Sequence, residues 1–572
     1  MVKAGHGGGF AREPLMELDM PLTQSAQHAE APAHMGLVVG ASAAASAFEW
    51  YDFYIFGTLA PVISAKFFAG LSPSAGYIAA LALFGAGFVF RPLGALVFGR
   101  LGDQLGRKAA FLLTVLMMGG ATFAIGLLPT WHQVGVSASV LVVLARIIQG
   151  TALGGVYGGA AISVAEHAPA RSRGYYGSYV QISAPIGLLV ALLVVLVLRT
   201  TLGTVAFDAW GWRLCFLASV GLLAISVFMR MKMTESPLFA ALEAEGEGPA
   251  RSVYRETFGN TANLRLIAVA FFSMMCAQGA VFYTAYFYVQ VFLEKSLGLD
   301  PRVSGALLMG VVALSAPMFI VAGRLSDRYG RKPVMLCGML IALVAYFPAF
   351  EAMQTAVNPT LAAALQRAPV VVVADPADCV TQFDPIGKAP FNSSCNVAKS
   401  FLVNAGLSYG QRAAPAGSLA QIEVGTVVVP SASATGLAPA AAASVKADFA
   451  ARVRSALVAA GYPEKADPAK VGKLALFGLM LIFGIAAALV YGPLSTAAVE
   501  LFPTRIRYTA LSVPYHVGVG WVGGFLPFTV YAIVITTGDI FAGLWYPFVF
   551  TAISFISMLF FLPETRGRSL DF

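Results

Sequence analysis

A ten-residue basic segment occurs twice in this chain, and each copy stands between long apolar runs. Gly99–Lys108 reads GRLGDQLGRK and Gly323–Lys332 reads GRLSDRYGRK, so seven of ten positions agree at an offset of 224 residues. An apolar run of about 18 or more residues can cross the roughly 30 Å hydrocarbon core of a bilayer. The repeat therefore predicts a membrane protein built of two similar halves, an arrangement found in many secondary transporters.

The composition excludes an ordinary soluble domain. Hydrophobic residues make up 58% of the 572 residues and charged residues only 12%, whereas soluble domains carry about 25% charged residues. The net charge of +8 does not indicate nucleic-acid binding, because the Lys and Arg residues lie in short loops beside the apolar runs. We therefore expect the lipid bilayer as a partner and no nucleic acid.

The apolar runs predict an all-α membrane protein of twelve transmembrane helices in two six-helix halves. Residues 1–36 are expected to form a flexible tail without a cleavable signal peptide. The predicted units are an N-terminal half at 37–231, a linker at 232–262, a C-terminal half at 263–353 and 471–562, an insert at 354–470 and a tail at 563–572. The spans are expected at about 38–66, 76–99, 108–128, 137–165, 174–199, 211–231, 264–293, 303–324, 333–353, 472–498, 509–536 and 541–562.

The distribution of Lys and Arg predicts the orientation. Basic residues gather in the repeat loops and in the loops on the same side, whereas the alternate short loops hold little beyond Lys66, Lys295 and Arg302. Positively charged loops stay in the cytoplasm. The repeat loops and both termini are therefore predicted to be cytoplasmic.

The position of a second shared motif gives the length of an insert in the second half. EHAPARSR at Glu166–Arg173 and ELFPTRIR at Glu500–Arg507 share Glu, Pro, Arg and Arg at the same spacing, but at an offset of 334. The larger offset places 110 extra residues in the second half, close to the length of 354–470. This stretch, predicted to lie on the outer, periplasmic side of the membrane, contains Cys379 and Cys395, for which we predict a disulfide, and one plausible amphipathic helix at 447–461. Cys215, Cys276 and Cys337 are expected to pack within spans.

Several motifs resemble the major facilitator superfamily. They are GRLGDQLGRK, RIIQG at Arg146–Gly150, EHAPARSRG, TESPLF at Thr234–Phe239 and PETRGRSL at Pro563–Leu570. FEWYDFYIFG at Phe48–Gly57, RPLGALVFGRLGD and YGPLSTAAVELFPTRIRYT are similar to its metabolite:proton symporter branch. The resemblance implies transport of α-ketoglutarate, citrate, other carboxylates, shikimate, or proline and betaine with protons. The insert departs from the family pattern.

Charged residues at membrane depth are the first site candidates, because they usually face a cavity or a partner. Glu49 and Asp52 are three residues apart and share a helix face. The resemblance places Asp52 near Arg146, so we predict that Asp52 is the proton-coupling carboxylate, with Arg146 as its ion-pair partner and Glu49 beside it. The alternative is a static ion pair that fixes helix register.

Arg91 is the candidate substrate-binding residue. The repeat offset aligns it with Ser315, so it has no counterpart in the second half, and a guanidinium can grip a carboxylate through two parallel hydrogen bonds. The alternative is that Arg91 reaches the membrane interface or caps a helix. Further candidates for the cavity wall are Tyr54, Tyr157, Tyr283, Gln181 and Gln278, together with Trp50, Tyr51 and Tyr286, although most such aromatics simply pack. His516 titrates in a useful range, but a lone His is usually satisfied by a neighbour.

The repeat loops predict a cytoplasmic gate. Asp103 can accept hydrogen bonds from a helix N-terminus and from an arginine, and Arg107 can reach a carboxylate such as Glu166. By the same logic Asp327 and Arg331 would engage Glu500 or a neighbour. Such bridges must be individually modest, because alternating access needs two states within a few kcal/mol.

Three function classes compete: a proton-coupled importer of a small organic acid or zwitterion, a proton-driven exporter of drugs or metabolites, and a transporter-like receptor. The importer is favoured by the resemblance. An enzyme is not expected, because the chain has no GxxxxGK[ST] loop and no metal-spaced Cys/His cluster. We expect no cofactor or metal, protons as the coupling ion, a monomer, and a bacterial inner membrane as the location.

Overall fold

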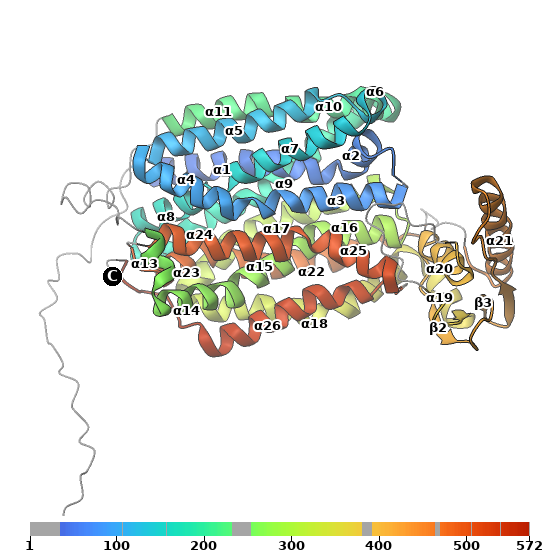
Figure 1. Cartoon of the computed structure of the whole chain (residues 1–572). Coiled ribbons are helices and arrows are strands. Elements are labelled where there is room, and N and C mark those ends of the chain that lie inside the picture. Colours follow the sequence, from blue (N-terminus) through green and yellow to red (C-terminus); the bar gives the residue numbers. More distant parts are fainter. Residues whose placement is uncertain are drawn as a thin grey trace, which may run out of the picture.

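The computed structural model is a bundle of long helices with a small folded unit at one end (Figure 1). It describes residues 35–71, 73–105, 107–155, 157–231, 253–379, 392–463, 470–504, 506–537 and 539–570. The predicted tail at 1–36 and linker at 232–262 lie largely outside these ranges. We call the end with the folded unit the insert end, and the opposite end, where the C-terminus lies, the arginine-rich end.

The first half consists of helices interrupted at glycines and prolines. Its elements are α1 (Met35–Thr58), α2 (Ala60–Phe67), α3 (Pro73–Val89), α4 (Arg91–Leu105), α5 (Arg107–Leu127), α6 (Trp131–Val134), α7 (Val136–Leu153), α8 (Tyr157–His167), η2 (Ala170–Ser172), α9 (Arg173–Ala206), η3 (Phe207–Gly211), α10 (Trp212–Leu217) and α11 (Ser219–Met231).

Glycines bring α3, α4 and α7 into close contact. A Cβ on Gly150 would come within 2.0 Å of the Gly87 carbonyl oxygen, and one on Gly154 within 2.1 Å of the Arg91 carbonyl oxygen. Small residues allow helix backbones to approach in lipid, where van der Waals packing drives association. This contact fixes the backbone of Arg91 deep in the bundle.

The second half follows the same plan on both sides of the insert. Its elements are α13 (Val253–Gly259), α14 (Thr261–Ala270), η4 (Phe271–Met275), α15 (Cys276–Tyr283), η5 (Thr284–Tyr288), α16 (Val289–Val291), η6 (Phe292–Ser296), α17 (Pro301–Tyr329), α18 (Arg331–Val357), α22 (Lys473–Tyr491), α23 (Leu494–Leu501), α24 (Arg507–Val517), η7 (Gly518–Gly523), α25 (Leu526–Thr537), η8 (Ala542–Leu544) and α26 (Trp545–Phe561). The seventh span contains three π-helical turns, η4, η5 and η6. Such turns are frequent at functional sites.

The helices account for the twelve predicted spans. In the described part of the chain, nine helices are long and apolar enough to cross a membrane, and one of these, Ala170–Ile225, covers both the fifth and the sixth span. The first span is α1 with α2, and the third is α5, whose apolar part is Leu113–Leu127. The two halves pack together through helices such as α9 and α17. Cys215 and Cys276 are buried, but Cys337 is exposed, so its expected packing role is wrong.

The insert is a folded α/β unit, which the sequence did not predict beyond one helix. Its elements are α19 (Pro359–Arg367), β1 (Val370–Ala374), α20 (Ser394–Asn404), β2 (Gly410–Ala413), β3 (Gln421–Val424), β4 (Val427–Pro430) and α21 (Pro439–Ala459). The strand order is β2-β1-β3-β4. β1 pairs in parallel with β2, and the β1–β3 and β3–β4 pairs are antiparallel. Helices and sheet enclose a hydrophobic core of their own.

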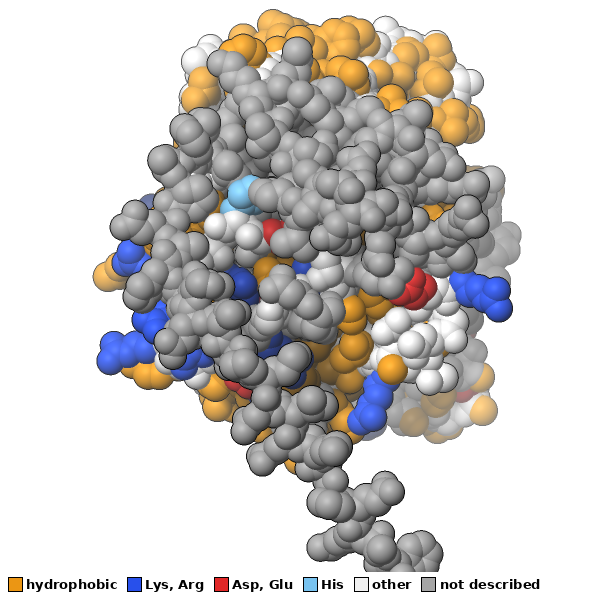
Figure 2. All heavy atoms as spheres, turned by 90° about the vertical axis from the view of Figure 1, so that its left-hand side faces the viewer, with side chains coloured by type: hydrophobic (Ala, Val, Ile, Leu, Met, Phe, Trp, Pro, Cys, Tyr) orange, Lys and Arg blue, Asp and Glu red, His pale blue; other side chains and the backbone are white. Residues whose placement is uncertain are grey.

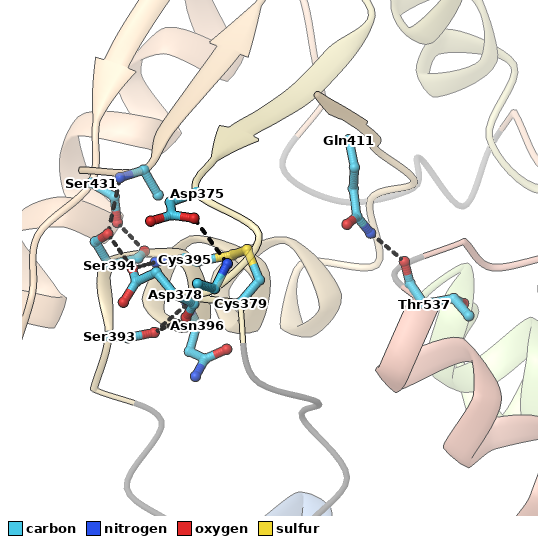
Figure 3. Close-up of a disulfide and its surroundings, with 12 residues drawn as sticks. Asp375, Asp378, Cys379, Ser393, Ser394, Cys395, Asn396, Gln411, Ser431 and Thr537 are labelled. Carbon is cyan, nitrogen blue, oxygen red and sulfur yellow. Dashed lines mark hydrogen bonds between the residues drawn. A yellow bond between two sulfur atoms is a disulfide. The ribbon is translucent and has the colours of Figure 1, made fainter. Parts of the chain in front are cut away.

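The disulfide ties the start of α20 to the segment after β1. Cys379 and Cys395 are bonded, with their Cα atoms 5.1 Å apart (Figure 3). Asp378 accepts hydrogen bonds from the Ser394 hydroxyl at 2.7 Å and from the Cys395 amide at 3.1 Å. The carboxylate therefore caps the N-terminus of α20, where a negative charge is favourable.

A second carboxylate fixes the end of β1. Asp375 accepts the backbone N–H groups of Ala377 at 2.9 Å and Gly417 at 2.7 Å. These bonds favour the ionised form and lower the pKa of Asp375. Because this pKa is lower in the folded than in the unfolded chain, the contribution is present above about pH 4 and is lost as the pH falls further.

Replacing Cys379 and Cys395 with serine should destabilise the insert by about 3 kcal/mol, because the bond closes a loop with a sequence separation of 16. Limited proteolysis of the purified protein should then cut within 358–472 faster than in the wild type, while the bundle stays intact. Equal cleavage rates in the two proteins would show that the bond adds nothing to the stability of the insert.

Candidate functional site

The interior between the halves is built around Arg91. Its side chain is 2% exposed. The guanidinium lies 3.9 Å from the Phe88 ring centroid, 4.7 Å from that of Phe53 and 5.5 Å from that of Trp50. On the side of the second half it lies near Tyr283 and the α24 residue Tyr515. Arg91 therefore lies at the interface between the halves and not at the membrane surface, which removes the alternative that it reaches that surface.

Several polar atoms around Arg91 lack a hydrogen-bond partner among the described residues. They are Nε and Nη2 of Arg91 and the hydroxyls of Tyr54 and Tyr283. Oε1 of the buried Gln278 on α15 also lacks a partner among the described residues. A buried polar atom left without a partner costs roughly 1–3 kcal/mol. A small polar ligand that met these atoms would recover that free energy.

The remaining predicted wall residues have different surroundings. Trp50 stacks on Tyr54 with centroids 5.1 Å apart, whereas Tyr286 is already bound to Ser315 at 2.8 Å. Gln181 is fully buried in α9. Tyr157 begins α8, but its side chain lies outside the described residues.

Three residues to which the sequence analysis gave little weight or no role also belong to this interior. The Nε2 atom of His516 lies 3.1 Å from the Gly154 carbonyl oxygen, and its Nδ1 lacks a partner in the described structure. Tyr515 lies 2.9 Å from Tyr491, hydroxyl to hydroxyl. Tyr491 belongs to the YGPLSTAAVE motif, but nothing in the sequence indicated that its side chain lies in this interior.

Asp52 and Arg146 share one network but do not form the predicted direct ion pair. Asp52 is 4% exposed and Arg146 is fully buried. In the described structure the Arg146 guanidinium donates to Gln149 Oε1 and, at 3.1 Å, to the Phe84 carbonyl oxygen. It also lies 4.3 Å from the Phe56 ring centroid. The direct pair is therefore a wrong prediction for this conformation, because aromatic rings and Gln149 surround the guanidinium.

Gln149 connects the two charges. Its Nε2 donates to the Asp52 carbonyl oxygen at 2.9 Å and to the Thr122 hydroxyl at 2.8 Å, while its Oε1 accepts from Arg146. Thr122 in turn contacts the Asp52 carboxyl group, and Glu49 is close enough to interact with it electrostatically. The RIIQG motif contains Gln149, but only the structure shows that it bridges two spans.

Buried ion pairs close the arginine-rich end. Arg331 pairs with Glu500 at 3.1 Å and with Asp327 at 2.6 Å, and Glu500 is 0% exposed. Asp327 also accepts the backbone N–H groups of Gly174 at 2.8 Å and Tyr175 at 2.7 Å, at the N-terminus of α9. This carboxylate on α17 thus holds the first half against the second, and a negative charge is favourable at a helix N-terminus.

A second cross-half pair lies nearby. Glu166 pairs with Arg507 at 3.4 Å, whereas the sequence assigned Arg107 as its partner. Side chains at Asp103 and Arg107 lie outside the described residues, so the first copy of the repeat is not described at this level. Figure 2 views this end of the bundle and shows Lys and Arg side chains gathered on it; exposed examples are Arg171, Arg324, Arg328 and Arg566.

The C-terminal segment also helps to close the arginine-rich end. Glu564 accepts the backbone N–H groups of Arg331 at 2.9 Å and Lys332 at 3.1 Å. Thr565 donates to Glu500 at 3.0 Å. The Leu570 carbonyl oxygen accepts from Arg507 at 2.9 Å. This end is therefore closed by contacts among both halves and the tail.

Comparisons with known proteins agree with this architecture. The family model of the Major Facilitator Superfamily matches residues 42–365, and that of sugar (and other) transporters matches residues 445–571. A glycine betaine/proline/ectoine/pipecolic acid transporter of Dickeya dadantii is 34% identical over 54% of this chain and 63% of its own length. The shikimate transporter of Escherichia coli is 36% identical, over 55% of this chain and 71% of that protein.

Solved structures show the same fold. A proton:xylose symporter bound to 6-bromo-6-deoxy-D-glucose superposes with a TM-score of 0.59 and covers 95% of this chain and 98% of its own. Its sequence identity is 16%, so this likeness establishes the fold and not the substrate.

Proposed function

The chain belongs to the major facilitator superfamily, and we propose that it imports a small organic acid or zwitterion together with protons. The observation that carries the proposal is the buried Arg91, with two donors free of partners among the described residues, at the interface between the halves. Relatives named as shikimate and betaine/proline transporters support this substrate class. Each of those substrates carries a carboxylate.

The proposed orientation follows from charge. The arginine-rich end would face the cytoplasm of a bacterial cell, with both termini inside, because cytoplasmic loops carry excess Lys and Arg. The insert would then lie on the outer side of the inner membrane, where a disulfide persists. We propose that the protein works as a monomer, without a cofactor and with protons as the coupling ion.

The proposed mechanism joins the two buried arginines. Arg91 binds the substrate carboxylate through its free donors, and Tyr54 and Tyr283 donate from the two halves. Protonation of Asp52 turns an acceptor into a donor next to Thr122 and Gln149, and this changes how Gln149 holds Arg146. The closing pairs at the arginine-rich end then release as the halves rock about the site.

Arg91→Lys should weaken substrate binding by about 10- to 100-fold, because a lysine keeps the charge but loses the two-pronged contact, and a charged hydrogen bond contributes roughly 1.5–3 kcal/mol. The KM for uptake is the measurement. A matched control is Arg328→Lys, which changes an exposed arginine at the arginine-rich end. An unchanged KM in Arg91→Lys would remove Arg91 from the binding site.

The function is tested with purified protein in proteoliposomes. Labelled shikimate, glycine betaine, proline, citrate and α-ketoglutarate are offered outside under an inward proton gradient. We expect accumulation of at least one of them, and its loss when a protonophore collapses the gradient. Substrate expulsion under the same gradient, or no response to the gradient for any of these compounds, would contradict the proposal.

A further inference from the structure

Two cavities at the insert end meet at one carboxylate. The larger, about 730 Å³, lies between α2 and α9 of the first half and η6 and α17 of the second. The smaller, about 40 Å³, lies deeper and reaches Tyr77, Phe84 and Phe287. Among the described lining residues, the acidic residue common to both cavities is Glu294. The smaller volume is enough for a water molecule.

Polar neighbours hold the Glu294 carboxylate in place. Gln290 Nε2 donates to Glu294 Oε1 at 2.9 Å, and the Ser304 hydroxyl donates to the same oxygen at 2.5 Å. Both bonds end on Oε1, which leaves Oε2 as the oxygen able to take a proton.

The charged and titratable groups around Glu294 come from both halves. Lys295, the next residue, places Nζ 4.3 Å from the ring centroid of Tyr77 on α3, and Tyr77 is itself within electrostatic reach of Glu294. The larger cavity also contains Arg199, Asp300 and Arg302. Arg302 donates across the halves to Thr204 at 2.8 Å.

The smaller cavity ends against the residues that surround the buried arginines. Phe84 and Phe287 close its deep side with ring centroids 5.5 Å apart. The Phe84 carbonyl oxygen accepts from Arg146, and Phe287 stacks on Tyr283 at 5.3 Å. One layer of aromatic side chains therefore separates the smaller cavity from the site around Arg91.

We infer that Glu294 is the outer proton-accepting group of the transporter. This inference rests on the proposed function. The carboxylate takes a proton from a hydronium ion in the larger cavity, which leaves a neutral acid and a water molecule. It gives the proton to a water molecule in the smaller cavity. This transfer regenerates the carboxylate and forms a hydronium ion on the inner side of Glu294.

The insert supports the turn that carries this residue. Gly406 lies in the insert with φ 66°, and a Cβ there would come within 2.6 Å of the Ser296 carbonyl oxygen. Leu407 shares a small pocket with Lys295 and Ser296. The insert thus packs directly against the end of η6, next to Glu294.

The test measures initial uptake in proteoliposomes against external pH, using the labelled compound from the panel that the wild type accumulates. Wild-type uptake should rise as the external pH falls from about 8 to about 6. Glu294→Gln, whose amide oxygen can still accept from Gln290 and Ser304, should lose this rise but keep substrate exchange at equal pH.

The matched control is Glu351→Gln, an exposed carboxylate on α18 outside both cavities. It should behave like the wild type. A wild-type pH profile in Glu294→Gln, with proton-driven uptake intact, overturns the inference and leaves the proposed function standing. If wild-type uptake does not respond to the proton gradient, the proposed function fails and the inference falls with it.

Discussion

Replacing Asp52 with asparagine should abolish proton-driven accumulation while leaving substrate exchange intact. The amide keeps the size of the side chain and can still bond to Thr122, but it cannot take or release a proton. Uptake against a gradient needs a proton to move with the substrate, whereas exchange of labelled for unlabelled substrate does not. The two modes of transport should therefore separate in this variant.

The measurement for Asp52→Asn compares accumulation under a proton gradient with counterflow in the same proteoliposomes. The control is Asp448→Asn, because the Asp448 side chain is 72% exposed in the insert and pairs only with Arg452 one helical turn away in the described structure. Full proton-driven accumulation in Asp52→Asn would place the coupling carboxylate elsewhere. Loss of both modes would show that Asp52 is needed for binding or folding rather than for coupling.

Replacing Glu500 with glutamine should open the arginine-rich end. Glu500 is fully buried and pairs with Arg331 at 3.1 Å and with Arg173 at 4.0 Å. Removing one partner of a buried pair costs up to roughly 3–5 kcal/mol, and Arg331 would then keep Asp327 as its charged partner among the described residues. The two conformations of a transporter differ by only a few kcal/mol, so this change should invert their populations.

Spin labels at Arg171 and Tyr329, one in each half, report the opening of this end in Glu500→Gln. Both positions are exposed, and exposed Cys337 must first be replaced with serine. The label distance should lengthen relative to wild type. The double variant Glu500→Gln/Arg331→Gln should recover part of the closed population, because it also removes the cation that has lost its buried partner Glu500. An unchanged distance distribution in Glu500→Gln would show that this pair does not hold the closed state.

The spans could be predicted from the sequence because their signal is local. Each needs only length, apolar composition and a basic or glycine break, and the repeat supplied the symmetry. Within the insert only one helix was predicted, because its four strands have only four or five residues each and lie among Ala- and Pro-rich segments. Their pairing joins residues far apart in the chain, such as Val371 with Gly410 and Glu423.

The sequence indicated which residues belong to the candidate site but not which of them contact one another. Asp52, Arg91 and Arg146 are all buried in the bundle, as the cost of charge in lipid requires. The prediction of a direct Asp52–Arg146 ion pair was wrong because such a pair depends on how the two helices are rotated about their axes. The identity of single residues does not determine that rotation. Gln149 occupies the position between Asp52 and Arg146.

The same limit applies to the contacts of the predicted gate residues and to Glu294. Glu166 binds Arg507 from the other half, a partner that the sequence did not name. The partners of Glu500 include the tail residue Thr565, which no spacing rule connects to it. Glu294 was absent from the predictions because it stands at the end of a span, and only the cavities show what it faces.

The central claim, that substrate and proton move together through the interface around Arg91, is tested most directly by substrate-driven proton flux. Proteoliposomes at equal pH inside and outside, with a pH-sensitive dye inside and the membrane potential clamped, receive an inward gradient of the transported compound. The account predicts internal acidification that Asp52→Asn abolishes. Substrate entry with no change in internal pH would contradict it.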